Sequence, residues 1–140
     1  MEVHNPLNEL ESVQARKDQE DPWVMYLIVR ASLEMGTGKI GAQVGHAVAM
    51  MYEHYFTGAY VLSKAVDPFS FFHWRKDSFR KVVLRANEKK WEKIKENLEC
   101  FVVRDAGLTE VDPGSETVIG IWPMKKSEQP RLLKKLQALK

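Results

Sequence analysis

Residues 23–51, WVMYLIVRASLEMGTGKIGAQVGHAVAMM, decide the fold class of this chain. Residues 23–30 form an apolar, β-branched run, which is typical of a β-strand. Residues 31–38 contain two glycines and predict a turn. A strand, a turn and a helix in this order indicate an α/β fold. The helix is predicted from Lys39 onward by apolar residues at helical spacing, which are Ile40, Val44, Ala47, Val48 and Met51.

Further strands and helices alternate along the rest of the chain. Asn87 is a good N-cap for a helix over residues 87–99, and Ser127 is a candidate cap for a last helix over 127–139. Pro123 is expected to end the fourth strand because proline cannot donate to a sheet ladder. Three apolar segments predict the strands, at residues 81–85, 100–104 and 116–121.

The predicted order of elements is β-α-(α)-β-α-β-β-α, in which the aromatic stretch 56–79 supplies one short helix followed by a loop. Helices between strands imply right-handed parallel crossovers. The loop at 105–115 is too short for a crossover helix, so the third and fourth strands are expected to be antiparallel. We therefore predict an α/β fold, a single-domain four-stranded mixed β-sheet with helices on both faces, over residues 22–140. Residues 1–21 are expected to form a flexible polar N-terminal tail, with partial helix as an alternative.

Composition limits the classes of function. The 140 residues favour one domain, and the net charge of +2 permits contact with a polyanion without indicating one. Cys100 is the only cysteine, so an internal disulfide is impossible, and a small buried side chain is a better interpretation than a catalytic thiol. The sequence shows no apolar run of membrane-spanning length and no signal-peptide core. We therefore predict a cytoplasmic protein without a membrane partner.

Residues 36–41, GTGKIG, match the spacing of a dinucleotide-binding fingerprint. The fingerprint needs its first glycine directly after the strand and an acidic residue about 20 positions further on. Here five residues precede Gly36, and Val61 stands where the acidic residue should be. A phosphate-binding P-loop also fails, because Leu33 replaces its first glycine and Ile40 its Ser or Thr. We predict no nucleotide cofactor.

Two polar groups survive this test. A glycine-flanked helix start with Lys39 suits a phosphate or a developing oxyanion, and Gln43 and His46 follow on the same helix face. Asp105 to Thr109 directly follow a strand, where ligand-binding groups gather in α/β sheets. The alternatives are an ordinary loop with a solvated lysine, and a plain turn at Asp105. The four histidines show no metal-ligand spacing, and no Ser-His-Asp motif occurs.

Several motifs, taken in order, resemble those of the type-2 peptidyl-tRNA hydrolase family. The resemblance covers about residues 24–139, and it is specific because separate motifs occur in one order. The matching segments are residues 35–43 (MGTGKIGAQ), His46-Ala47, 81–84 (KVVL), 105–107 (DAG), Thr109 and 113–118 (PGSETV).

This resemblance implies hydrolysis of the ester that joins a peptide to the terminal ribose in peptidyl-tRNA, without a metal or other cofactor. Lys39 is expected to hold a phosphate or polarise the ester carbonyl, and Asp105 to orient the attacking water and accept its proton. Thr109 and Thr117, the other catalytic positions, are expected to position water or the ribose. The substrate-binding residues implied are Gly38, Gln43, His46, Gly107 and Ser115.

The chain departs from the family pattern at a few positions. Thr37 and Leu108 stand where the family usually has a basic residue and an arginine, and Val44-Gly45 replace a Cys-Ser pair. Two fewer cations weaken tRNA binding, since each phosphate contact adds affinity. The alternative function is therefore a catalytically inactive family member that binds RNA or protein. The intact catalytic set favours the enzyme.

Three roles compete for the aromatic segment from Phe69 to Trp74. In the interpretation that we favour, the rings complete the core or a lid over it, because aromatic side chains bury large areas. They could instead form the contact of a homodimer, which the resemblance implies as an alternative. They could also stack on the unpaired end of tRNA, with Arg75, Lys76 and Arg80 supplying cations.

Overall fold

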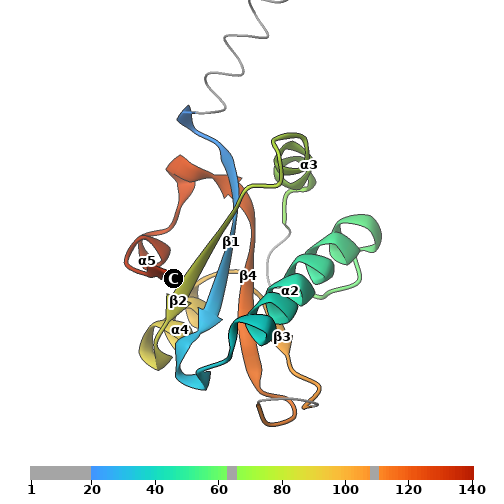
Figure 1. The fold of residues 1–140 in the computed structure, drawn as a ribbon. Coiled ribbons are helices and arrows are strands. Elements are labelled where there is room, and N and C mark those ends of the chain that lie inside the picture. The colour runs from blue at the N-terminus through green and yellow to red at the C-terminus, as the bar shows by residue number, and fades with distance from the viewer. Residues whose placement is uncertain (1–19, 63–65, 108–110) are drawn as a thin grey trace, which may run out of the picture.

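The centre of the fold is a five-stranded mixed sheet with the order β3-β4-β1-β2-β5 (Figure 1). The computed structural model describes residues 20–62, 66–107 and 111–140, so most of the predicted tail, Leu108 and Thr109 lie outside the described residues. Strand β1 pairs in parallel with β2, whereas β4 is antiparallel to both β1 and β3. The strands are β1 (Trp23–Arg30), β2 (Lys81–Ala86), β3 (Phe101–Arg104), β4 (Glu116–Lys125) and β5 (Gln137–Ala138).

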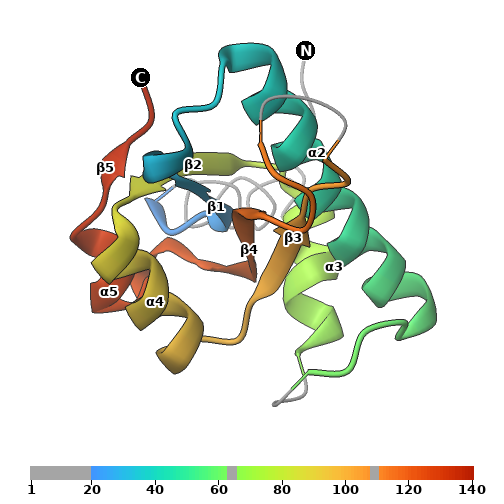
Figure 2. The same ribbon diagram turned by 90° about the horizontal axis from the view of Figure 1, so that it is seen from below.

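Helices cover both faces of this sheet, as predicted (Figures 1 and 2). Helices α2 (Thr37–Thr57) and α3 (Pro68–Lys76) lie on one face, and α4 (Glu88–Asn97) and α5 (Arg131–Lys134) lie on the other. Successive side chains of β1 alternate between the two resulting cores, as the period of a strand requires. Met25, Leu27 and Val29 face α2 and α3, and the residues between them face α4 and α5.

The prediction of a four-stranded sheet was wrong by one strand, and so was the helix predicted over residues 127–139. A short 3₁₀ turn at Lys126–Glu128 ends before Pro130, after which α5 lasts four residues. Proline disfavours helical backbone at the residue before it and lacks the N–H that a continuing helix needs. The chain then adds β5 to the edge of β2, and the Leu139 N–H donates to the Val83 carbonyl at 3.0 Å.

Pro123 does not end the fourth strand, contrary to the prediction. Strand β4 continues to Lys125 because the register against β1 shifts between Val24 and Tyr26, which leaves one extra residue on β4 at this point. Proline is tolerated at such a bulge, where no ladder hydrogen bond is lost.

The aromatic stretch holds its elements in a different order from the prediction. Helix α2 begins at Thr37 and continues to Thr57, so Phe56 belongs to it, and Gly58 ends it with a φ of 66°. The second helix, α3, comes late in the stretch rather than early. Asp67 caps it by accepting from the Phe69 N–H at 2.9 Å, and Pro68 takes a first-turn position, where its missing N–H costs nothing.

Two local predictions were confirmed. Asn87 caps α4, with its side chain accepting from the Lys90 N–H at 2.9 Å. Strands β3 and β4 are antiparallel. Over the described ranges, we find no helix with the length and apolar character needed to cross a membrane.

Candidate active site

A cavity of about 810 Å³ lies between α2 and the edge strand β3. One wall comes from the first turns of α2, where Gly38, Lys39, Gln43 and His46 follow each other along one face. The opposite wall is formed by residues 102–106 at the end of β3. The helix start and the strand end meet here because β1 and β3 are both antiparallel to β4, so their C-terminal ends lie at the same edge of the sheet. Residues 66 positions apart in the sequence, Lys39 and Asp105, therefore become neighbours.

Asp105 is the centre of the polar groups in this cavity. Its carboxylate accepts a hydrogen bond from the Lys39 ammonium, a second from Gln43 Nε2 at 3.2 Å, and a third from the Gly107 N–H at 2.6 Å. The Lys39 ammonium lowers the pKa of Asp105 most, and the Gly107 N–H lowers it further against the effect of desolvation. Asp105 is therefore ionised throughout the neutral pH range.

Gly107 is required by the loop that carries Asp105. Its φ is +80°, a conformation that side chains rarely adopt, and an added Cβ would lie 2.3 Å from Pro113 Cγ. Hydrogen bonds close the loop, with the Asp105 N–H donating to the Ser115 carbonyl at 2.9 Å and the Gly114 N–H donating to the Asp105 carbonyl at 2.8 Å. The motif residues Gly107 and Ser115 thus hold Asp105 through their backbones.

Thr117 lies one layer beneath the cavity. Its hydroxyl donates to Gln43 Oε1 at 2.5 Å, and both side chains are buried. This bond fixes the orientation of the Gln43 amide, whose Nε2 must then point at Asp105. In this arrangement the Thr117 hydroxyl reaches the cavity only through Gln43.

A β-bulge in β4 turns Thr117 toward α2. Val103 pairs with Val118, but Arg104 pairs with Glu116, so Thr117 is the extra residue. Regular alternation would place Thr117 beside Ile119, on the α4 face of the sheet. Bulges often re-aim side chains next to active sites. Here the bulge places Thr117 against Gln43 and sends Glu116 to the opposite face.

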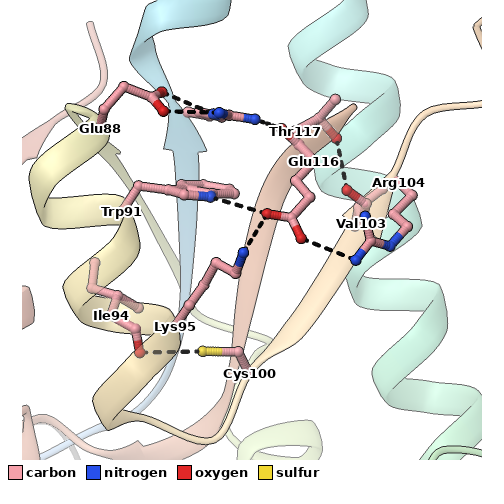
Figure 3. Close-up of polar contacts among 10 residues, drawn as sticks. Glu88, Trp91, Ile94, Lys95, Cys100, Val103, Arg104, Glu116 and Thr117 are labelled. Atoms are coloured by element: carbon pink, nitrogen blue, oxygen red, sulfur yellow. Dashed lines mark hydrogen bonds and ion pairs between the residues drawn. The ribbon is translucent and has the colours of Figure 1, made fainter. Parts of the chain in front are cut away.

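Contacts of Glu116 on the α4 side of the sheet stabilise the bulge (Figure 3). Its carboxylate contacts Lys95 Nζ at 2.6 Å and Arg104 Nη2 at 3.1 Å, and its backbone carbonyl accepts from Arg30 Nη1 at 3.2 Å. Burial by itself would raise the pKa of Glu116, but its contact with Lys95 and further donors give a net lowering. Arg30 in turn binds both carboxylate oxygens of Glu88 at 2.8 Å.

The structure brings together most of the residues that the sequence singled out. Gly38, Lys39, Gln43, His46 and Asp105 line the cavity. Gly107 and Ser115 support Asp105, Thr117 lies beneath Gln43, and Thr109 lies outside the described residues. The sequence analysis missed Met50, Glu53 and Glu116. Helical spacing from His46 could have found the first two, whereas Glu116 lies in the matching segment 113–118 but has contacts that depend on the bulge.

Two other candidate features of the sequence have structural explanations. Gly38 and Gly41 lie inside α2 rather than in the turn before it, and an added Cβ on either residue would meet no atom within 4 Å. Burial, followed by the nearby Glu99, raises the pKa of Cys100 to about 12, which makes a thiolate inaccessible at neutral pH. In the described part of the chain, His, Cys, Asp and Glu form no group of three that could hold a metal ion.

The Thr117 hydroxyl is predicted to be needed for both stability and activity. Thr117→Val keeps the shape but leaves the buried Gln43 Oε1 without a donor, which should lower the free energy of unfolding by about 1–3 kcal/mol. The Gln43 amide should then turn and release Asp105, so kcat should fall as well. Urea denaturation and turnover measurements would test this, with Thr117→Ser as a matched control that keeps both quantities. A Thr117→Val variant as stable and active as the wild type would contradict the role.

Comparison with known proteins gives one consistent result. A family model described as "Peptidyl-tRNA hydrolase PTH2" matches residues 23–139. The chain is similar to a "Peptidyl-tRNA hydrolase" of Methanococcus vannielii, with 32% identity over 120 residues, or 81% of this chain and 96% of the relative. A protein of the same name from Methanocaldococcus jannaschii is 31% identical, over 82% of this chain and 98% of its own length. A "Probable peptidyl-tRNA hydrolase 2" of Drosophila melanogaster is 30% identical, over 85% of this chain and 63% of its own length.

Proposed function

The chain belongs to the peptidyl-tRNA hydrolase PTH2 family, and we propose that it hydrolyses the ester bond between peptide and tRNA in peptidyl-tRNA with a centre built on Lys39 and Asp105. The observation that carries this proposal is the carboxylate of Asp105, held in the cavity by an ammonium, an amide and a backbone N–H. The hydrolysis releases a free tRNA for reuse. We also propose that the protein acts in the cytoplasm.

Asp105 can still bind a water molecule in this arrangement. A carboxylate offers about four acceptor sites, and three donors occupy Asp105, so roughly one remains for a water. Because its pKa is lowered, Asp105 is a weak base before reaction. We therefore assign it the orientation of the water, and it accepts the proton as the water oxygen bonds to the ester carbonyl carbon.

Lys39 stabilises the charge that develops in the same step. As the water adds, the carbonyl oxygen becomes an oxyanion, and the Lys39 ammonium can donate to it from a position beside Asp105. The tetrahedral intermediate then collapses, the bond to the ribose oxygen breaks, and this oxygen takes up the proton from Asp105. The products are a peptide with a free carboxyl group and a tRNA with a free terminal hydroxyl.

The remaining motif residues are assigned to substrate binding. Gly38 lies in the first turn of α2, where backbone N–H groups and the helix dipole favour a phosphate. His46 is exposed on the same helix face and lines the cavity, so it can donate to the tRNA end. Thr109, which lies outside the described residues, remains a proposed ligand of water or ribose. Ser115 and Gly107 act through Asp105.

We predict that the purified protein releases the peptide part from N-blocked aminoacyl-tRNA without added metal. EDTA should not reduce the rate, because the proposed chemistry uses only side chains. Aminoacyl-tRNA with a free amino group should be a poor substrate. The measurement is release of labelled N-acetyl amino acid from tRNA at increasing enzyme concentration. Binding of tRNA without turnover would replace this proposal with the alternative, an inactive family member that binds RNA.

A further inference from the structure

The cavity continues beyond Lys39 and Asp105 along α2. Its helix wall includes Lys39, Gln43, His46, Met50 and Glu53, which are spaced by four, three, four and three residues and therefore form one stripe. Fourteen residues separate Lys39 from Glu53, so with a rise of 1.5 Å per residue the stripe extends roughly 21 Å. The part beyond His46, lined by Ala49, Met50, Glu53 and Val102, forms a distal arm of the cavity.

The chemistry of the distal arm differs from that of the catalytic end. Ala49 and Met50 make its helix wall apolar, and its far end carries the exposed carboxylate of Glu53. Glu53 accepts a hydrogen bond from the Tyr60 hydroxyl at 3.1 Å, which fixes the carboxylate at this end. A carboxylate repels phosphates, so the arm is not suited to the backbone of tRNA.

The strand wall of the cavity is the edge of the sheet. Among the described residues, β3 pairs with β4 alone, and Figure 1 shows β3 at the margin of the sheet beside α2. The N–H and carbonyl of Asp105 point toward β4, where they bond to Ser115 and Gly114. Because backbone groups alternate along a strand, those of Val102 and Arg104 point away from β4, toward the open edge. An open edge is a template for an added extended chain.

We propose that the distal arm binds the peptide of the substrate as an extended chain alongside β3. The C-terminal carbonyl of the peptide lies at Lys39 and Asp105, and its N-terminal residues run toward Glu53. This inference rests on the proposed function, since it assumes that the ester is cleaved at the catalytic end. An extended chain rises about 3.3 Å per residue, so roughly six residues reach Glu53. Peptide side chains beside Met50 then contact an apolar wall. A basic residue about six positions from the ester, counted toward the peptide N-terminus, contacts the Glu53 carboxylate.

The test compares two N-acetylated hexapeptidyl-tRNA substrates that differ only at the N-terminal residue of the peptide. This residue, the sixth from the ester, is Lys in one substrate and Glu in the other. The wild type should have a higher kcat/KM for the Lys substrate, by about two- to fivefold, the size of a solvent-exposed ion pair. Glu53→Gln should remove the preference, and Glu53→Lys should invert it. Glu53 is exposed, so these changes should not disturb folding. Glu96→Lys on α4 is the matched control, because this exposed acid lies on the opposite face of the sheet and should leave the preference unchanged.

Substrate length gives a second and independent measurement. KM should fall as the peptide grows from one residue to about six and should then stay constant. Equal KM values for all lengths would overturn the inference. An equal effect of Glu53→Lys on both hexapeptidyl substrates, and on N-acetyl-aminoacyl-tRNA, would mean that the arm receives the tRNA end instead. Absence of turnover on every substrate would overturn the proposed function itself, which is a distinct result.

Discussion

Replacing Asp105 by asparagine is expected to reduce kcat/KM by about 10²- to 10⁴-fold, the range seen when a positioned acid–base group is removed. Asparagine has nearly the same shape, so the cavity should keep its form. It cannot accept the proton of the attacking water, however, and its amide group would face the donors Lys39 and Gln43 with one oxygen instead of two. Steady-state hydrolysis of an N-blocked aminoacyl-tRNA would measure the loss.

Asp112→Asn is the matched control, because Asp112 is an exposed acid in the same loop. It should remain within about twofold of the wild type, as expected for a surface change away from the cavity. The double variant Lys39→Ala/Asp105→Asn should lose little more than Asp105→Asn alone, because residues that act as a unit are not additive. An Asp105→Asn enzyme within tenfold of the wild type would show that Asp105 is not the proton acceptor.

Local sequence patterns predicted the parts of the fold that depend on local physics. The apolar run at 23–30, the stripe of the first crossover helix and the Asn87 cap each reflect a period or a capping bond within a few residues. Strand β5 could not be predicted in this way. It consists of two exposed residues, and it exists because the edge of β2 is available for pairing. Pro130, which the prediction of a helix over 127–139 did not take into account, is a local signal against that helix.

In the candidate site, too, some features follow from local sequence patterns and others only from contacts between distant parts of the chain. Lys39 and Asp105 were predicted as site residues from a helix start, a strand end and a family resemblance. The face of the sheet toward which the Thr117 side chain points could not be predicted, because regular alternation along the strand predicts the opposite face. Only the register between β3 and β4 reveals the bulge that turns Thr117 toward Gln43, and this register is set by contacts between distant parts of the chain. For the same reason the residues next to Glu116 in the sequence do not reveal its four contact partners.

Among the aromatic residues, the structure separates buried rings from exposed ones. Trp74 and Phe71 are 0% exposed and belong to the core between the sheet and α2 with α3. Phe69 and Phe72 on the same helix are 71% and 41% exposed. The burial of Trp74 excludes it as a platform for stacking on tRNA. A homodimer contact remains a proposal, and it would involve the exposed pair.

Trp74→Ala is expected to lower the free energy of unfolding by about 3–5 kcal/mol, the cost of removing a large buried aromatic side chain. The ring packs against Phe71 at a centroid distance of 5.2 Å, and its Nε1 donates to the Arg80 carbonyl at 2.7 Å. The substitution would therefore leave a cavity and also remove a hydrogen bond that ties the chain before β2 to α3. Urea denaturation should show the loss, whereas turnover per folded molecule should stay near the wild-type value because Trp74 does not line the cavity that holds Lys39 and Asp105.

Phe72→Ala is the matched control, since it removes an aromatic ring from the same helix at an exposed position and should cost less than about 1 kcal/mol. Light scattering on a sizing column adds a readout of mass for both variants. A shift of Phe72→Ala from twice the chain mass of 16.2 kDa to the single mass would place the homodimer contact on the exposed pair. A Trp74→Ala protein with unchanged stability and a raised KM for tRNA substrate would contradict the core assignment, because a ring that carries no packing energy must be acting on the substrate.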